Sequence, residues 1–95
     1  MTDYRIEAEP SVNADIEAAF QWYEREEPGL GFIDELRHSY RRILNGPFKY
    51  QELRSGIRRA LTRRFPYAIY FSVEGEIIVV AVLHTARDPA EWQRR

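Results

Sequence analysis

The sequence predicts an α+β domain in which two helices cover one face of an antiparallel sheet. Three patterns in the 95 residues carry this prediction: an alternating segment near the start, two segments with helical spacing, and alternating segments after residue 50. At this length the chain is expected to form one domain, residues 1–95, with a modest core. A functional site is then expected in a groove or on the surface, because so small a domain cannot enclose a deep cavity.

The first segments predict a strand and a helix. Tyr4, Ile6 and Ala8 alternate with charged residues, as in a strand with one buried face. Asn13 is a typical helix N-cap, and Pro28-Gly29 is expected to end the helix. The apolar residues at helical spacing between them are Ile16, Ala19, Phe20 and Tyr23.

A second helix is predicted from Gly31, and it is expected to end at Asn45-Gly46-Pro47 through a left-handed glycine cap. Its apolar side is formed by Ile33, Leu36, Tyr40 and Ile43. Since the connection between the two helices is short, we expect them to form an antiparallel hairpin.

Period-two alternation from residue 50 onward predicts three or four antiparallel strands. The first is expected to place Ile57, Leu61 and Phe65 on one face and Arg58, Ala60, Thr62 and Arg64 on the other, with Pro66 interrupting it. Tyr67 to Val73 then alternates, and Glu74-Gly75 turns the chain into an apolar strand from Ile77 to Leu83. A short C-terminal helix is predicted from Asp88.

Composition excludes several classes of protein. The absence of cysteine excludes disulfides, thiolate metal sites and a cysteine nucleophile. The longest apolar run, Ile77 to Leu83, is far shorter than the roughly 20 residues that span a membrane. No metal-binding motif, cofactor-binding motif or signal peptide is recognisable, so we expect a cytoplasmic protein without a metal, a cofactor or a membrane partner.

Charge is distributed unevenly along the chain. Residues 1–36 hold ten acids and two arginines, whereas residues 37–95 hold twelve bases and five acids, giving about −8 and +7. Every base in the second part except Lys49 is arginine, whose planar guanidinium binds carboxylates and phosphates. The alternative is a solvated basic face that pairs with the acidic helix of the same molecule.

A small set of basic residues could carry catalysis. RNA cleavage through a 2′-hydroxyl needs a base, an acid and cations. His84 could be the base or the acid, with Arg58 and Arg87 stabilising charge, and we expect His84 to lie beside Arg58 and Arg64. Structural roles are equally open: His84 could cap a strand end, Arg87 could pair with Asp88, and Trp92 could anchor the C-terminal helix.

The C-terminal third resembles the RelE/ParE toxin family of bacterial type II toxin–antitoxin modules. Phe65-Pro66-Tyr67 is similar to a strand start common in that family, and the segment from His84 to Trp92 is similar to its final His-x-x-Arg-Asp-Pro-x-x-Trp. The resemblance implies the RelE/ParE fold for nearly the whole chain. It also implies a growth-arresting toxin with an antitoxin encoded beside it.

Two branches of that family imply different activities. Members that cut messenger RNA on the ribosome usually carry a proton-transferring residue near Trp92 and an arginine near Tyr67, and tryptophan cannot transfer a proton. The chain therefore resembles the ParE type more closely, which implies inhibition of DNA gyrase without catalysis. A ribosome-dependent endoribonuclease of the RelE type, and a decayed member without toxicity, remain as alternatives.

The expected contacts with the target or the antitoxin involve mainly arginines. The candidates are Arg37, Arg41, Arg58, Arg59, Arg64, Arg87 and Trp92. Arg59 shares a strand side with Leu61, so its stem could instead cover apolar surface. A homodimer or a toxin–antitoxin hetero-oligomer is consistent with this set.

Overall fold

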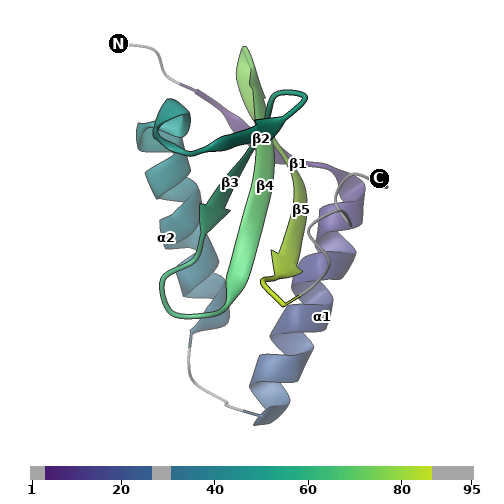
Figure 1. The fold of residues 1–95 in the computed structure, drawn as a ribbon. Helices are drawn as coiled ribbons and strands as arrows, with labels where there is room; N and C mark the ends of the chain where they lie inside the picture. The colour runs from purple at the N-terminus through teal and green to yellow at the C-terminus, as the bar shows by residue number, and fades with distance from the viewer. Residues whose placement is uncertain (1–3, 27–30, 87–95) are drawn as a thin grey trace.

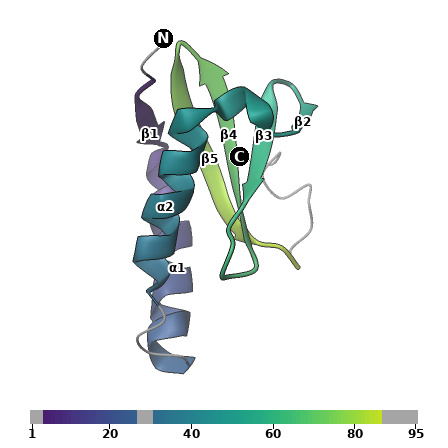
Figure 2. The same ribbon diagram turned by 90° about the vertical axis from the view of Figure 1, so that its left-hand side faces the viewer.

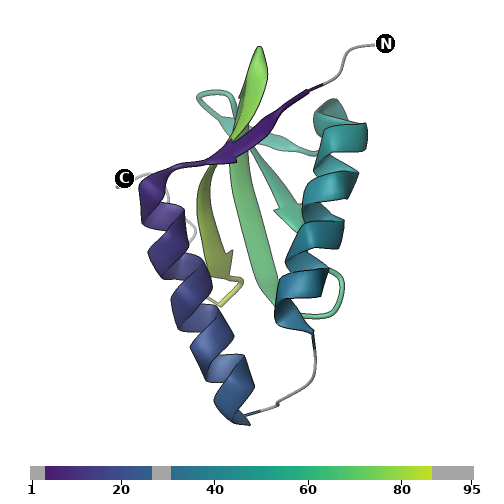
Figure 3. The same cartoon turned by 180° about the vertical axis from the view of Figure 1, so that it is seen from behind.

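Two helices lie on one face of a five-stranded sheet (Figure 1). The computed structural model describes residues 4–26 and 31–86. Both helices are on the same side of the sheet when the molecule is seen edge-on (Figure 2), and from that side they run antiparallel across it (Figure 3). The predicted α+β architecture is therefore confirmed, and the C-terminal helix predicted from Asp88 lies outside the described residues.

The strand order in the sheet is β1-β5-β4-β3-β2. Along the chain the elements are β1 (Ile6–Ala8), α1 (Pro10–Glu26), α2 (Phe32–Asn45), the 3-10 helix η1 (Pro47–Lys49), β2 (Glu52–Arg54), β3 (Ile57–Leu61), β4 (Tyr67–Glu74) and β5 (Glu76–His84). Strands β2 to β5 are antiparallel, as predicted, whereas β1 pairs in parallel with β5 at the sheet edge.

Helix α1 begins at Pro10, so the prediction that Asn13 caps it is wrong. Proline suits the first helical position, because its fixed φ is helical and its missing N–H would have no partner there. The N–H of Glu9 donates to the carbonyl of Val79 at 2.9 Å, which joins the end of β1 directly to the helix start. Phe20, predicted to be in the apolar stripe, is 38% exposed, and Val12 is fully buried instead.

Helix α2 starts and ends where the sequence predicts, but its C-terminal cap differs. Gly31 precedes the helix with a left-handed φ of 76°. Gly46 has a φ of −173°, which is extended backbone, so the predicted left-handed cap is wrong. The chain leaves α2 into η1, where Pro47 supplies a helical φ for the next turn.

The predicted β4–β5 hairpin is confirmed. Glu74 pairs with Glu76 around Gly75, whose φ of 80° is the left-handed value that favours glycine. Alternation places Ile69 and Phe71 in the core under the helices. Alternate residues form a second buried cluster on the other face, consisting of Ala68, Tyr70, Ala81 and Leu83.

Strand β3 is shorter than predicted, but its alternation is as predicted, with Ile57 and Leu61 on one face and Arg58 and Ala60 on the other. Ala60 packs in the core under the helices, whereas Leu61 is 56% exposed on the opposite face. Thr62 to Pro66 form a turn, so Pro66 lies between strands instead of interrupting one. Within this turn Phe65 packs in the core, and its ring contacts that of Tyr23, with 4.7 Å between the ring centroids.

Candidate functional site

Arg58 is bound within the fold. One guanidinium nitrogen donates to the carbonyl of Tyr50 at 2.6 Å, and the other reaches a carboxylate oxygen of Glu52 at 3.4 Å. The guanidinium also lies over the ring of Phe48, 5.0 Å from its centroid, and the side chain is 19% exposed. These contacts tie η1 and β2 to β3.

His84 lies at the end of β5 and is half-buried. Its Nδ1 accepts a hydrogen bond from the N–H of Ala86 at 3.0 Å, which is the strand-end capping role considered as an alternative. Its ring also meets that of Tyr67 edge-on, with 5.3 Å between the centroids.

The structure does not bring Arg58 and His84 together. In the sheet register Arg58 lies opposite Phe71 of β4, whereas His84 lies opposite Tyr67 of the same strand. These positions are four residues apart along β4, about 13 Å at the usual strand rise, and β3 and β5 are separated by about 10 Å across β4. The expectation that His84 lies beside Arg58 is therefore wrong. Arg64 lies in the turn after β3, and the carbonyl of Pro66 in that turn accepts a hydrogen bond from the N–H of Thr85 at 2.7 Å. Arg87 lies outside the described residues.

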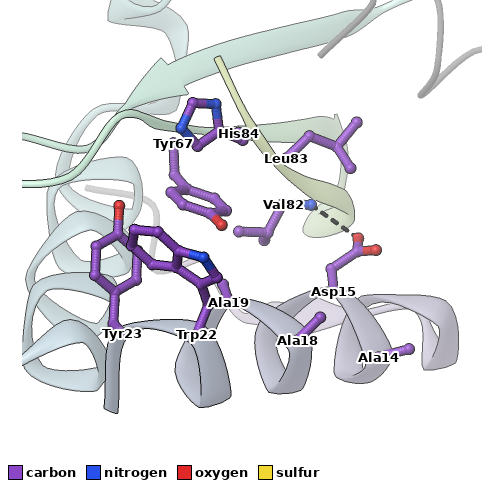
Figure 4. Close-up of a pocket in the computed structure, with 10 residues that line it drawn as sticks. All are labelled: Ala14, Asp15, Ala18, Ala19, Trp22, Tyr23, Tyr67, Val82, Leu83 and His84. Atoms are coloured by element: carbon purple, nitrogen blue, oxygen red, sulfur yellow. Dashed lines mark hydrogen bonds between the residues drawn. The ribbon is translucent and has the colours of Figure 1, made fainter. Parts of the chain in front are cut away.

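A groove of about 470 Å³ separates α1 from the end of β5 (Figure 4). Its α1 wall includes Ala14 and Ala18, and Trp22, which is 46% exposed, stands at one end. In the groove a carboxylate oxygen of Asp15 accepts a hydrogen bond from the N–H of Val82 at 3.1 Å. Strand β1 pairs with β5 only as far as Val79, so the N–H of Val82 has no partner in β1. Asp15 supplies the acceptor instead, and the bond holds α1 against the sheet.

Sequence reasoning did not identify this groove. The signal that could have found it is the spacing of Ala14, Ala18 and Trp22, four residues apart on one side of a helix. Two small residues followed by a large aromatic one leave space beside the helix. The bond between Asp15 and Val82 carries no such signal, because it joins residues 67 positions apart.

The remaining described candidate arginines are at the surface. Arg37 and Arg41 are exposed on α2, and Arg37 makes a loose ion pair with Asp34 at 3.8 Å. Arg59 is half-buried on β3 and Arg64 is exposed in the turn that follows. Exposed pairs such as Asp34–Arg37 contribute little to stability, so these side chains are available to a partner. Trp92, like Arg87, lies outside the described residues.

Glu35 of α2 organises the turn after β3, although sequence reasoning missed it. Its buried carboxylate accepts hydrogen bonds from the N–H of Arg63 at 2.9 Å, from Arg42 at 3.1 Å and from Ser39 at 3.2 Å. Burial on its own raises the pKa of Glu35, but these donors and the charge of Arg42 outweigh it and hold the pKa below the ordinary value of 4.5.

Within residues 4–26 and 31–86, no group of three or more histidine, aspartate or glutamate side chains is placed to hold a metal ion. No helix in the same ranges is long and apolar enough to cross a membrane. The geometry is that of a surface with a groove, which His84, Tyr67 and Asp15 line, and with several exposed arginines.

Comparison with known structures identifies the fold of this protein. A solved structure described as "Chromosomal ParDE TA system from P. aeruginosa" is similar with a TM-score of 0.73 and 13% sequence identity, covering 86% of this chain and 96% of that chain. At this identity the likeness establishes the fold, which is that of a ParE-like α+β domain.

The family model for the "ParE toxin of type II toxin-antitoxin system, parDE" matches residues 6–89. The chain therefore belongs to the ParE toxin family, which confirms the resemblance seen in the C-terminal motif. Membership implies an antitoxin partner in a ParDE module. No curated protein sequence matches the chain.

Proposed function

We propose that this ParE-family toxin arrests bacterial growth in the cytoplasm by binding DNA gyrase, without catalysing a reaction. The observation that carries the proposal is the separation of Arg58 from His84. A nuclease needs its acid, base and cations around one phosphate, within hydrogen-bond reach of the reacting atoms. Arg58 is instead bound to Tyr50 and Glu52, and His84 lies on the far side of β4.

The arginines that this proposal assigns to target binding lie in two places, one on α2 and one on and after β3. Arg37 and Arg41 lie one turn apart on α2, and Arg59 and Arg64 lie on and just after β3. Guanidinium groups bind carboxylates and phosphates in a bidentate way, and gyrase with its DNA presents both. Arg87 and Trp92 remain candidates for target binding, whereas we assign Arg58 to the fold.

We further propose that the antitoxin is encoded beside this protein and forms a hetero-oligomer with it. An acidic segment that folds on binding would neutralise the excess of arginine after residue 36. Silencing a toxin requires that almost none be free, so the dissociation constant is expected to be nanomolar or lower, about −12 kcal/mol.

The test is a supercoiling and DNA-cleavage assay with purified gyrase and this chain alone. The expected result is loss of supercoiling at toxin concentrations comparable with that of gyrase. If gyrase is unaffected and messenger RNA is cut on ribosomes, the RelE-type activity is correct instead. If neither occurs in a folded preparation, the chain is a decayed member of its family.

The variant His84→Asn distinguishes gyrase inhibition from RNA cleavage. The Oδ1 of asparagine can accept the Ala86 N–H as Nδ1 does now, so the strand end is retained while the titratable group is lost. Gyrase inhibition is expected to be unchanged. A nuclease that relied on His84 would lose about 10²-fold or more in rate.

A further inference from the structure

Strand β3 extends beyond β2, the strand beside it at the sheet edge. Strand β2 pairs through Glu52 with Arg58 and through Arg54 with Ile57, and the last contact on this side is the Arg59 N–H donating to Gln51 at 3.2 Å. Among the described residues, no backbone group pairs with Leu61 on this side. One end of β3 is therefore an open edge.

The orientation of the Leu61 backbone follows from its neighbours. In an antiparallel ladder, successive residues direct their N–H and C=O groups alternately to the two sides. The Arg59 N–H points outward to Gln51, and the Thr62 N–H points inward to Tyr67 at 3.0 Å. The N–H and C=O of Leu61 consequently point outward, where a further strand would bind.

The open edge ends at Glu35. The N–H of Arg63 is the next outward donor after Leu61, and it is held by the Glu35 carboxylate at 2.9 Å. A carboxylate from α2 thus occupies the position that the carbonyl of a neighbouring strand would take. Judged from the described part of the chain, the section of this edge between Gln51 and Glu35 is open to another strand.

The side chains at this edge define what it can bind. Leu61 is 56% exposed, so an apolar surface lies next to the outward backbone groups. Arg59 is on the same strand, and the exposed Arg63 and Arg64 follow it. The acid on the neighbouring β2, Glu52, is already bound to Arg58.

We propose that an acidic, extended segment of the antitoxin adds to the sheet beside β3, pairing with the N–H and C=O of Leu61. An apolar side chain of the segment would cover Leu61, and its carboxylates would bind Arg59, Arg63 and Arg64. Main-chain pairing supplies affinity in such strand addition, and the side chains supply specificity. This inference rests on the proposed pairing with an antitoxin, and it assigns the place and the chemistry of the contact.

The same charges disfavour a second copy of the chain at this edge. Pairing β3 with β3 would place Arg59, Arg63 and Arg64 of one copy close to those of the other, and like charges across a strand pair are destabilising. Charged side chains are a common way to prevent sheet edges from self-association. An acidic partner turns this repulsion into attraction.

Amide hydrogen exchange of the toxin with and without the purified product of the neighbouring gene tests the inference. The Leu61 amide should exchange fast in the free toxin and at least about tenfold more slowly in the complex, because it gains a hydrogen bond. The amides of Ala60 and Thr62, already bonded within the sheet, serve as internal references. Binding that leaves Leu61 unchanged would overturn the inference but not the toxin–antitoxin pairing, whereas absence of binding would overturn both.

Two pairs of variants complete the test. Leu61→Pro removes the outward donor, which the ladder with β4 does not use, and should weaken antitoxin binding about tenfold more than Leu61→Ala. Arg64→Glu should weaken it about tenfold, whereas Arg5→Glu, the same charge change on the opposite sheet edge, should alter it less than twofold. If Leu61→Pro does not fold, the comparison of Arg64→Glu with Arg5→Glu tests the proposed binding edge by itself. Protection of Leu61 that grows with the concentration of toxin alone would assign the edge to a second copy instead.

Discussion

Arg58 and Arg59 are adjacent and chemically identical, yet the fold gives them different roles. Arg58 points to the helix-covered side, where Tyr50, Glu52 and Phe48 hold it. Arg59 lies on the other side of β3 together with Leu61, as the sequence predicts. At the level of single residues, the sequence identified a basic strand but not which of its guanidinium groups is available to a partner.

Glu35 should make stability depend on pH. Its pKa is lowered in the folded protein, so its contribution is present above the unfolded value near 4.5 and is lost as the pH falls through the lower folded value. Glu35→Gln is expected to lower the free energy of unfolding by about 1–3 kcal/mol at pH 7, because the Arg63 N–H and Arg42 lose a charged acceptor. Urea denaturation at several pH values measures this difference.

The difference between wild type and Glu35→Gln should shrink as the pH is lowered below about 4.5, because the wild-type carboxylate then becomes protonated as well. Glu24→Gln, at an exposed position of α1, is the matched control and should have little effect at any pH. A stability difference that does not change with pH would show that Glu35 acts through packing and not through its charge.

Among the helices, the start of α1 can be tested by substituting Asn13. The sequence-based prediction and the structure give opposite orders of stability for the alanine and glycine variants. At an N-cap, alanine is worse than glycine by up to about 1 kcal/mol, whereas inside a helix glycine is worse than alanine by a similar amount. Because α1 begins at Pro10, Asn13 is an exposed interior position. Asn13→Ala is therefore expected to be more stable than Asn13→Gly, measured by chemical denaturation. The reverse order would mean that the helix begins at Asn13 in solution.

The strands show why some elements were predictable and others were not. The β4–β5 hairpin depends on local alternation and on a glycine with positive φ, and both are visible in the sequence. The alternation of β3 was predictable as well, but the face that the helices cover was not, because both faces of the sheet bury apolar residues. Alternation separates two sets of residues, but it cannot say which set the helices cover; the structure places Ala60 beneath the helices and Leu61 on the opposite face.

For the whole molecule, the uneven charge predicts how antitoxin binding depends on salt. If carboxylates of the antitoxin meet exposed arginines, the dissociation constant should rise about tenfold or more between 0.1 and 0.5 M NaCl, as screening increases. Isothermal titration or surface binding at several salt concentrations measures this. Arg64→Glu should flatten the dependence, and affinity that stays constant with salt would indicate a mainly apolar interface.

The sequence by itself determined the two helices, the terminal hairpin and the family, because periodicity, turn residues and the C-terminal motif are local properties of the chain. The parallel place of β1, the internal binding of Arg58, the separation of Arg58 from His84 and the open edge at Leu61 were decided by the tertiary structure alone. Arg58 is held by residues only six and eight positions away, but alternation does not reveal side-chain partners. The other features rest on contacts between residues far apart in the chain, such as Ile6 with Ile77 in the β1–β5 pair and Glu35 with Arg63 at a separation of 28. Such contacts form only when the strands pair and the helices dock on the sheet, and no local pattern encodes them.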